Sequence, residues 1–185
     1  MNRIRNLALM TACAWLVATT AWADEPGAPP RQARELECLI GTWAGDGTVE
    51  MGGQEHAVQI NYSCRRAAGG FGIACHLTMT GIPGFTYELD DLWGYDPGSG
   101  RIHWYTVTNA GETHDHQGHA DRTSFRGSYV GRREGRPMRE NVSFVFDGND
   151  RFTVRSTVYV ARQRVESVVA TIAREPSGRA ELSSR

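Results

Sequence analysis

The sequence contains no lysine, and all 20 of its basic residues are arginine. A catalytic lysine that forms a Schiff base with its substrate is therefore excluded. The arginines are balanced by 21 acidic residues and gather into no basic face or tail. This charge distribution is not typical of nucleic-acid-binding proteins, so no nucleic-acid partner is expected.

Common catalytic motifs are also missing. The chain has no Gly-x-Ser-x-Gly, no glycine-rich phosphate loop and no His-Glu-x-x-His. We therefore predict no catalytic residue, and the sequence favours a binding protein over an enzyme.

A long apolar run occurs only at the N-terminus. Two arginines in the first five residues precede an apolar stretch over 7–17, and Ala21-Trp22-Ala23 is an A-x-A cleavage site. Residues 1–23 are therefore predicted to be a signal peptide cleaved after Ala23, which implies a periplasmic or secreted protein. The apolar stretch is too short for a stable transmembrane anchor.

The rest of the chain divides into a linker, a folded domain and a tail. Residues 24–33 contain three prolines and no apolar period, so we expect a linker there. A short helix over about 32–39 must pack against something to be stable, and the open end of a barrel is a natural place. The folded domain is expected over 34–175, and the polar tail 176–185 is expected to be disordered.

Short stretches of alternating apolar and polar residues, separated by glycine, aspartate and asparagine, make up most of the chain. No helical window interrupts them, so a parallel sheet with crossover helices is not expected. The predicted fold is all-β: a ten-stranded antiparallel up-and-down β-barrel with a short N-terminal helix, in which closure removes the exposed sheet edges. The predicted strands are 41–50, 55–65, 71–80, 85–95, 101–109, 112–120, 123–133, 137–147, 151–161 and 164–174.

Cysteine is scarce, with four residues in the chain. Cys13 lies in the predicted signal peptide, although Met10-Thr11-Ala12-Cys13 also resembles a lipobox that would attach a lipid there. A simple register around the turn between the second and third strands places Cys64 opposite Cys75 on the apolar face. In an oxidising compartment this pair is predicted to form a disulfide, with two buried thiols as the alternative. Cys38 then stays free, or takes a partner if the helix lies near the second strand.

The first predicted strand begins with Gly41-x-Trp43, directly after the short helix and ahead of a run of antiparallel strands. This arrangement resembles the calycin group, which comprises lipocalins, fatty-acid-binding proteins and nitrobindin-like barrels. The resemblance implies that Trp43 closes the base of the barrel and that an arginine from a late strand packs across its ring. The candidates for that arginine are Arg155, Arg162, Arg164 and Arg174.

A second set of motifs lies further along the chain. Gly94-Tyr95-Asp96, followed by Trp104 and Gly118, resembles an uncharacterised bacterial family of secreted lipocalin-like proteins with a Gly-Tyr-Asp turn and a following Trp strand. The match spans about residues 36–174. The residues predicted to have structural roles are Gly41, Trp43, Gly94 and Asp96.

Haem binding does not carry over from the resemblance. Haem-binding nitrobindin-like barrels use a histidine late in the chain as the axial ligand. Here the last histidine is His119, ahead of the final strands. No cofactor is therefore predicted other than a divalent metal ion.

Histidines are concentrated between residues 113 and 119. On a strand, His114 and His116 point to one side and Asp115 to the other. Two imidazoles at this spacing suit Zn, Cu, Ni or Fe. The pair is therefore a candidate metal site, or a polar lining of a ligand cavity, or a solvent-facing pair without function.

The third metal ligand depends on the register of the neighbouring strand. If Ala110-Gly111 is a two-residue turn, His103 and Tyr105 share the side of the two histidines. Slipping the turn by one residue instead pairs Trp104 with His116 and breaks the arrangement. The predicted metal ligands are His103, His114 and His116.

The interior of the predicted barrel is the candidate site for a small apolar ligand. In fatty-acid-binding proteins, interior arginines hold the ligand carboxylate, and bidentate geometry suits that task. Arg126 or Arg139, in an arginine cluster around the seventh and eighth strands, is predicted to act in this way. The residues predicted to bind the ligand are Trp104, Tyr105, His114, His116, Arg126 and Arg139.

An acidic cluster lies on the fourth predicted strand. Glu88 and Asp90 share one face and Asp91 lies on the other. A carboxylate pair can perform acid–base catalysis. However, alternate positions from Tyr87 to Trp93 form the more apolar face, so we expect Glu88 and Asp90 on a solvated exterior.

Three functions are compatible with these patterns, and the sequence favours the first. It is an exported barrel, monomeric or homodimeric, that binds a small, largely apolar ligand. The second is a metal-binding protein or metal-dependent enzyme that uses the histidines of the fifth and sixth strands. The third is an envelope structural or assembly protein with a filled barrel. The size and lining of the barrel interior discriminate between them.

Overall fold

The computed structural model describes residues 27–176. The predicted signal peptide, the start of the predicted linker and most of the predicted tail lie outside the described residues. Helix α1 covers Arg31–Glu35 and continues as a 3-10 turn, η1, over Leu36–Leu39. The helix therefore begins inside the range predicted as linker. Within 27–176, no helix has the length and apolar character needed to cross a membrane.

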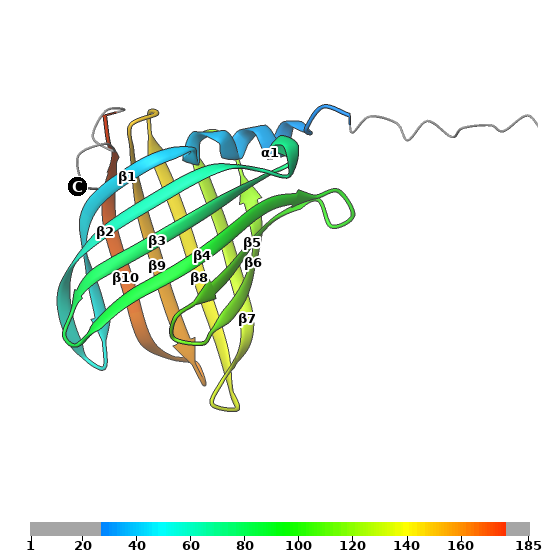
Figure 1. Ribbon diagram of the computed structural model, residues 1–185. Helices are drawn as coiled ribbons and strands as arrows, with labels where there is room; N and C mark the ends of the chain where they lie inside the picture. Colours follow the sequence, from blue (N-terminus) through cyan, green and yellow to red (C-terminus); the bar gives the residue numbers. More distant parts are fainter. Residues whose placement is uncertain (1–26, 177–185) are drawn as a thin grey trace, which may run out of the picture.

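Ten antiparallel strands follow and close into one barrel, which confirms the predicted fold (Figure 1). Each strand pairs with its neighbours in sequence, and the first pairs with the last, from Trp43 opposite Arg174 to Met51 opposite Glu166. A short 3-10 turn, η2 (Ala68–Gly70), joins the second and third strands. The strands are β1 (Gly41–Met51), β2 (Gln54–Ala67), β3 (Gly72–Ile82), β4 (Phe85–Asp96), β5 (Arg101–Thr108), β6 (Thr113–Ala120), β7 (Ser124–Arg133), β8 (Arg136–Asp147), β9 (Arg151–Val160) and β10 (Gln163–Arg174).

Alternate residues of each strand face the interior, as the sequence pattern predicts. On β2, every second residue from Val58 to Cys64 is buried, and the residues between them are exposed. The acidic residues of β4 divide in the same way: Glu88 and Asp90 are exposed and Asp91 is buried. Glu88 and Asp90 therefore lie on the outer face of the barrel, as the sequence pattern predicts.

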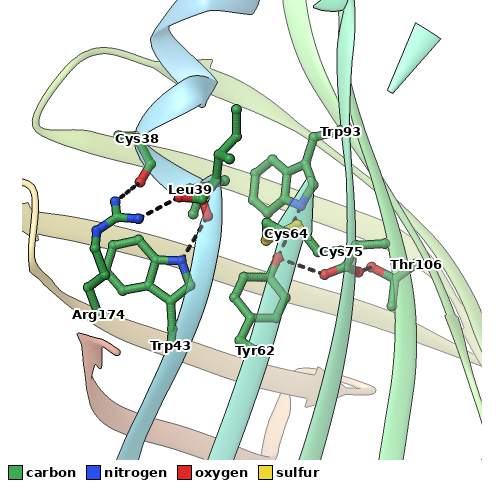
Figure 2. The surroundings of a disulfide bond; sticks show 11 residues. Cys38, Leu39, Trp43, Tyr62, Cys64, Cys75, Trp93, Thr106 and Arg174 are labelled. Atoms are coloured by element: carbon green, nitrogen blue, oxygen red, sulfur yellow. Dashed lines mark hydrogen bonds between the residues drawn. A yellow bond between two sulfur atoms is a disulfide. The ribbon is translucent and has the colours of Figure 1, made fainter. Parts of the chain in front are cut away.

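One end of the barrel is covered by α1 and η1 (Figure 1) and is closed by Trp43, which is 1% exposed. The indole Nε1 of Trp43 donates a hydrogen bond to the carbonyl of Leu39, at 2.8 Å. The guanidinium of Arg174 lies over the Trp43 ring (Figure 2) and donates to the carbonyls of Cys38 and Ile40. Of the four candidate arginines, Arg174 is therefore the one that packs across the tryptophan. We call this the closed end.

The other residues with predicted structural roles lie near the same end. Gly41 has φ of +131°, and a Cβ there would overlap the guanidinium of Arg174. The carboxylate of Asp96 accepts two backbone N–H groups of the following turn, at 3.0 and 2.9 Å. Among the described residues, nothing lies within 4 Å of where a Cβ of Gly94 would be, so packing does not require glycine at that position.

Cys64 and Cys75 lie directly opposite each other on β2 and β3 and form a disulfide, as predicted. Figure 2 shows the bond at the closed end, near Trp93. Among the described cysteines, Cys38 is free, and burial raises the pKa of its thiol to about 11. Since the thiolate is the reactive form, Cys38 is expected to be inert at neutral pH.

The pairing between β6 and β7 is short. Four residue pairs join the two strands, over Gln117–Ala120 of β6, all towards the closed end. Towards the opposite end, the ring of Tyr129 on β7 stacks on the imidazole of His114 on β6, with centroids 4.2 Å apart. Side chains rather than backbone hydrogen bonds therefore hold these two strands together near the open end.

Candidate functional site

The half of the barrel away from α1 is hollow. It contains a cavity of about 590 Å³, a size typical of small-molecule sites. The cavity opens at the end opposite the helix, where Pro83 and Ala110 of the hairpin turns lie at its rim. Phe152 forms part of its floor, since this ring lines the cavity and also contacts Trp43, at a centroid distance of 5.0 Å.

Most of the cavity wall is apolar. Aliphatic side chains come from strands all round the barrel, for example Val49 of β1, Leu77 of β3, Val154 of β9 and Val168 of β10. Trp104, which the sequence predicts as a ligand contact, is part of the wall. A ligand in this space therefore meets mainly hydrocarbon.

One wall carries a compact polar cluster built around Glu140. Its Oε2 atom lies 2.9 Å from Nε2 of His116 and 3.2 Å from Nδ1 of His114. Its other carboxylate oxygen accepts a hydrogen bond of 2.6 Å from the hydroxyl of Ser156. Glu140 and Ser156 line the cavity, and the imidazole side chains of His114 and His116 are 10% and 2% exposed.

Strand periodicity and stacking explain why these groups meet. His114 and His116 are two residues apart on β6, so both face the interior. Glu140 faces inward from β8, on the far side of β7. The ring of Trp104 stacks on His116 at 4.5 Å, and that of Tyr129 stacks on His114 at 4.2 Å. Both imidazole planes are therefore held in place by packing.

Glu140 is ionised at neutral pH despite its burial. Burial alone raises the pKa of this carboxyl. Hydrogen bonds from His114, His116 and Ser156, together with the charge of His116, outweigh that effect and hold the pKa well below its usual range. The cluster therefore presents a buried carboxylate beside two imidazoles, which is a donor set able to hold a cation.

Arg133 faces inward at the cavity rim, between two glutamates. Its Nε and Nη2 atoms donate to Glu112 at 3.0 and 3.2 Å, and its Nη1 donates to Glu166 at 3.4 Å. Burial alone lowers the pKa of Arg133, but the two carboxylates raise it above its ordinary value. Because these glutamates engage its donors, Arg133 is not free to hold a ligand carboxylate.

The two arginines predicted to hold such a carboxylate lie elsewhere, and this prediction is wrong. Arg126 and Arg139 are both exposed on the outer face. Arg139 donates to the side-chain oxygen of Asn141 there, at 3.0 Å. Inward positions on β7 have odd numbers, and Arg133 occupies one of them.

The β5–β6 hairpin differs from the predicted hairpin by one residue. The turn is a three-residue loop, Asn109–Gly111, whose last residue has φ of +81°. This conformation favours glycine and is typical of three-residue hairpin loops. Trp104 consequently lies opposite His116, as in the alternative register.

The predicted metal site of three histidines is therefore wrong. His103 lies on the outer face, with Nδ1 3.0 Å from Asp115 and Nε2 3.4 Å from the hydroxyl of Ser99. Tyr105, which was predicted to contact a ligand, is 47% exposed on the same face. Glu140 takes the place of His103 beside the two inward-facing imidazoles.

A second buried carboxylate, Asp91, belongs to a hydrogen-bonded network at the closed side of the cavity. It accepts hydrogen bonds from the hydroxyls of Tyr62 and Thr106, at 2.9 and 2.8 Å. Tyr62 in turn accepts from Nε1 of Trp93 at 3.2 Å, and Figure 2 shows these side chains next to the disulfide. Burial raises the pKa of Asp91 to about 6, although both hydroxyls oppose the shift.

Comparisons with known proteins bear on the fold. The sequence matches no family model and no curated protein. Among solved structures, the chain is similar to Rv2717c from M. tuberculosis, with a TM-score of 0.64 and 13% identity over 80% of this chain and 99% of that one. It is also similar to the S-type phycobiliprotein lyase CPES from Guillardia theta, with a TM-score of 0.52 and 10% identity over 80% and 99% of the two chains. This likeness shows the fold alone, which is a lipocalin-like barrel.

Sequence reasoning missed the central residue of the polar cluster in this lipocalin-like barrel. Glu140 is an acidic residue at an otherwise apolar inward row of β8, which was the available signal. Its partners could not be found in the same way, because β6 and β8 are not neighbours in the sheet. The inward row of β8 consists of Met138, Glu140, Val142, Phe144 and Phe146.

Proposed function

We propose that this protein is an exported lipocalin-like barrel that binds one small, largely apolar molecule in its interior. The observation that supports this most strongly is the cavity of about 590 Å³, with its mostly aliphatic and aromatic wall. Removing apolar ligand surface from water is favourable by about 25 cal/mol per Å². A structural protein with a filled barrel would pack this space with side chains instead.

The charges near the mouth restrict the polar group of the ligand. Arg133 is engaged by Glu112 and Glu166, and Glu140 is a carboxylate on the cavity wall. A fatty acid would bring a further carboxylate to this region without a free guanidinium to receive it. A neutral apolar molecule, or one with a hydrogen-bond donor, suits the cavity better.

Two observations support export. Residues 1–23 have the pattern of a cleaved signal peptide. Cys64 and Cys75 form a disulfide, a bond that persists in oxidising compartments such as the periplasm. These observations support our proposal that the mature protein is periplasmic or secreted.

Binding of the neutral dye Nile red tests the ligand proposal, with two neighbouring valines as a matched pair. Val168 lines the cavity, whereas Val169 points outward and is 38% exposed. A tryptophan at 168 fills part of the cavity, and the same change at 169 does not. We expect the wild type and Val169→Trp to bind one dye molecule, and Val168→Trp to bind at least about tenfold more weakly.

Circular dichroism and the intact disulfide show whether the two variants have folded. Equal dye binding by the wild type and both folded variants would place the dye outside the cavity and contradict the proposal.

A further inference from the structure

We propose that His114, His116 and Glu140 form a binding site for a divalent transition-metal ion inside the barrel. One ligand atom of each residue lies within 4.8 Å of the other two, and all three residues are buried or nearly so. The proposal does not depend on whether an apolar molecule also binds in the cavity.

The distances suit coordination of a single ion. Oε2 of Glu140 lies 2.9 Å from Nε2 of His116 and 3.2 Å from Nδ1 of His114. Zn–N and Zn–O bonds of about 2.0–2.2 Å place the ligand atoms of a tetrahedral site about 3.3 Å apart. A metal ion can therefore replace the hydrogen-bonded protons between these atoms with small movements of the side chains.

Neighbouring groups hold the ligand atoms in a suitable arrangement. The hydroxyl of Ser156 bonds the other carboxylate oxygen of Glu140, which leaves Oε2 for the ion. Nε2 of His114 faces a carboxylate oxygen of Glu112 at 3.7 Å, and carboxylates in this position orient metal-bound imidazoles. Aromatic rings stacked on both imidazoles fix their planes.

The fold does not require a polar cluster at this place. Burying a carboxylate and two imidazoles carries a desolvation cost that often equals the attraction between them. The inward neighbours of Glu140 on β8, Met138 and Val142, are apolar, and apolar residues would fill this wall as well. Binding a metal gives these three polar residues a reason to converge.

The donor set indicates the class of metal. Two imidazoles and one carboxylate occur in catalytic zinc sites and in non-haem iron sites, and they leave coordination positions open. Because Glu140 lines the cavity, an open position faces the space where a small molecule would lie. Nδ1 of His116 has no hydrogen-bond partner among the described residues, so we expect weaker binding than at a closed structural zinc site.

Isothermal titration calorimetry, in which Zn²⁺ is added to the metal-free mature protein, tests the site. The test variants are Glu140→Gln, which keeps the shape of the side chain, and His116→Ala. The control is His103→Ala, which removes a histidine from the outer face. We expect the wild type and His103→Ala each to bind one equivalent of Zn²⁺ with the same affinity. Affinity should fall at least about tenfold in both test variants.

Folding is checked separately, because His116 is packed against Trp104. Glu140→Gln can still accept the hydrogen bond of Ser156, so native circular dichroism with lost zinc binding in this variant supports the site. Zinc binding that is equal in the wild type and Glu140→Gln would overturn the proposal, since it would come from surface histidines. Loss of binding in His103→Ala would overturn it too. Nile red binding by Glu140→Gln tests the ligand proposal independently of the metal site. The two proposals can therefore fail separately.

Discussion

Arg174 on β10 covers the indole of Trp43 on β1, with its guanidinium carbon 4.0 Å from the ring centroid. The two residues lie opposite each other in the strand pair that closes the barrel. The same guanidinium donates to the carbonyls of Cys38 and Ile40 at the end of η1. A single side chain therefore joins the first strand, the last strand and the N-terminal helix.

We predict that Arg174→Lys lowers the free energy of unfolding by about 2 kcal/mol. A lysine keeps the charge but cannot stack on the indole and bond two carbonyls at once. Urea denaturation followed by tryptophan fluorescence measures the loss. Arg164→Lys is the control, because Arg164 forms an exposed pair with Glu50, and its effect should stay within about 0.5 kcal/mol. Equal effects of the two substitutions would show that Arg174 is not central to closure.

Asp91 is predicted to make stability depend on pH. Its pKa in the folded protein, about 6, lies above its ordinary value of 3.8, so the folded state binds the proton more tightly than the unfolded state. Protonated Asp91 therefore adds to the free energy of unfolding. This contribution is fully present below about pH 4 and is lost as the pH rises through 6. The whole change amounts to ~3 kcal/mol.

Asp91→Asn removes this titration and tests it directly. Denaturation of the wild type and the variant at pH 4 and pH 7 gives two stability differences, in which the effects of all other groups cancel. We expect the stability of the wild type relative to the variant to fall by about 2 kcal/mol from pH 4 to pH 7, because the rest of the change lies below pH 4. A difference that is independent of pH would show that Asp91 titrates normally.

The disulfide is predicted to contribute measurably to stability. Cys64 and Cys75 are 11 residues apart, and a loop of that length corresponds to roughly 2–3 kcal/mol of unfolding free energy. The double variant Cys64→Ala/Cys75→Ala should lose about that much in urea denaturation. Cys38→Ala leaves the bond intact and should change stability by less than about 1 kcal/mol. A double variant as stable as the wild type would show that the bond is dispensable for folding.

Most of the fold could be predicted from the sequence because the signals are local. The alternation from Val58 to Cys64 reports which face of β2 is buried, and the turn that follows determines its pairing with β3. The same parity places Cys64 opposite Cys75. The sequence could not identify Arg174 among the four candidate arginines. That choice depends on the register in which β10 pairs with β1 to close the barrel.

The candidate site was harder to predict because its residues come together through register and closure. A glycine in the left-handed conformation at Gly111 adds one residue to the β5–β6 loop, which moves His103 to the outer face. The inward arginine of β7 could have been predicted from Phe125. Every second residue after Phe125 faces inward, and Arg133 is one of these residues. Glu140 reaches the histidines across β7, and nothing in the local pattern records that contact.

Native mass spectrometry of the protein purified from the cell envelope tests the central claim, that the barrel holds one small molecule, most directly. We predict a species heavier than the processed chain by one small apolar molecule, retained in Val169→Trp and lost in Val168→Trp. A mass equal to the bare chain with its disulfide, together with unchanged Nile red binding in Val168→Trp, would contradict the account.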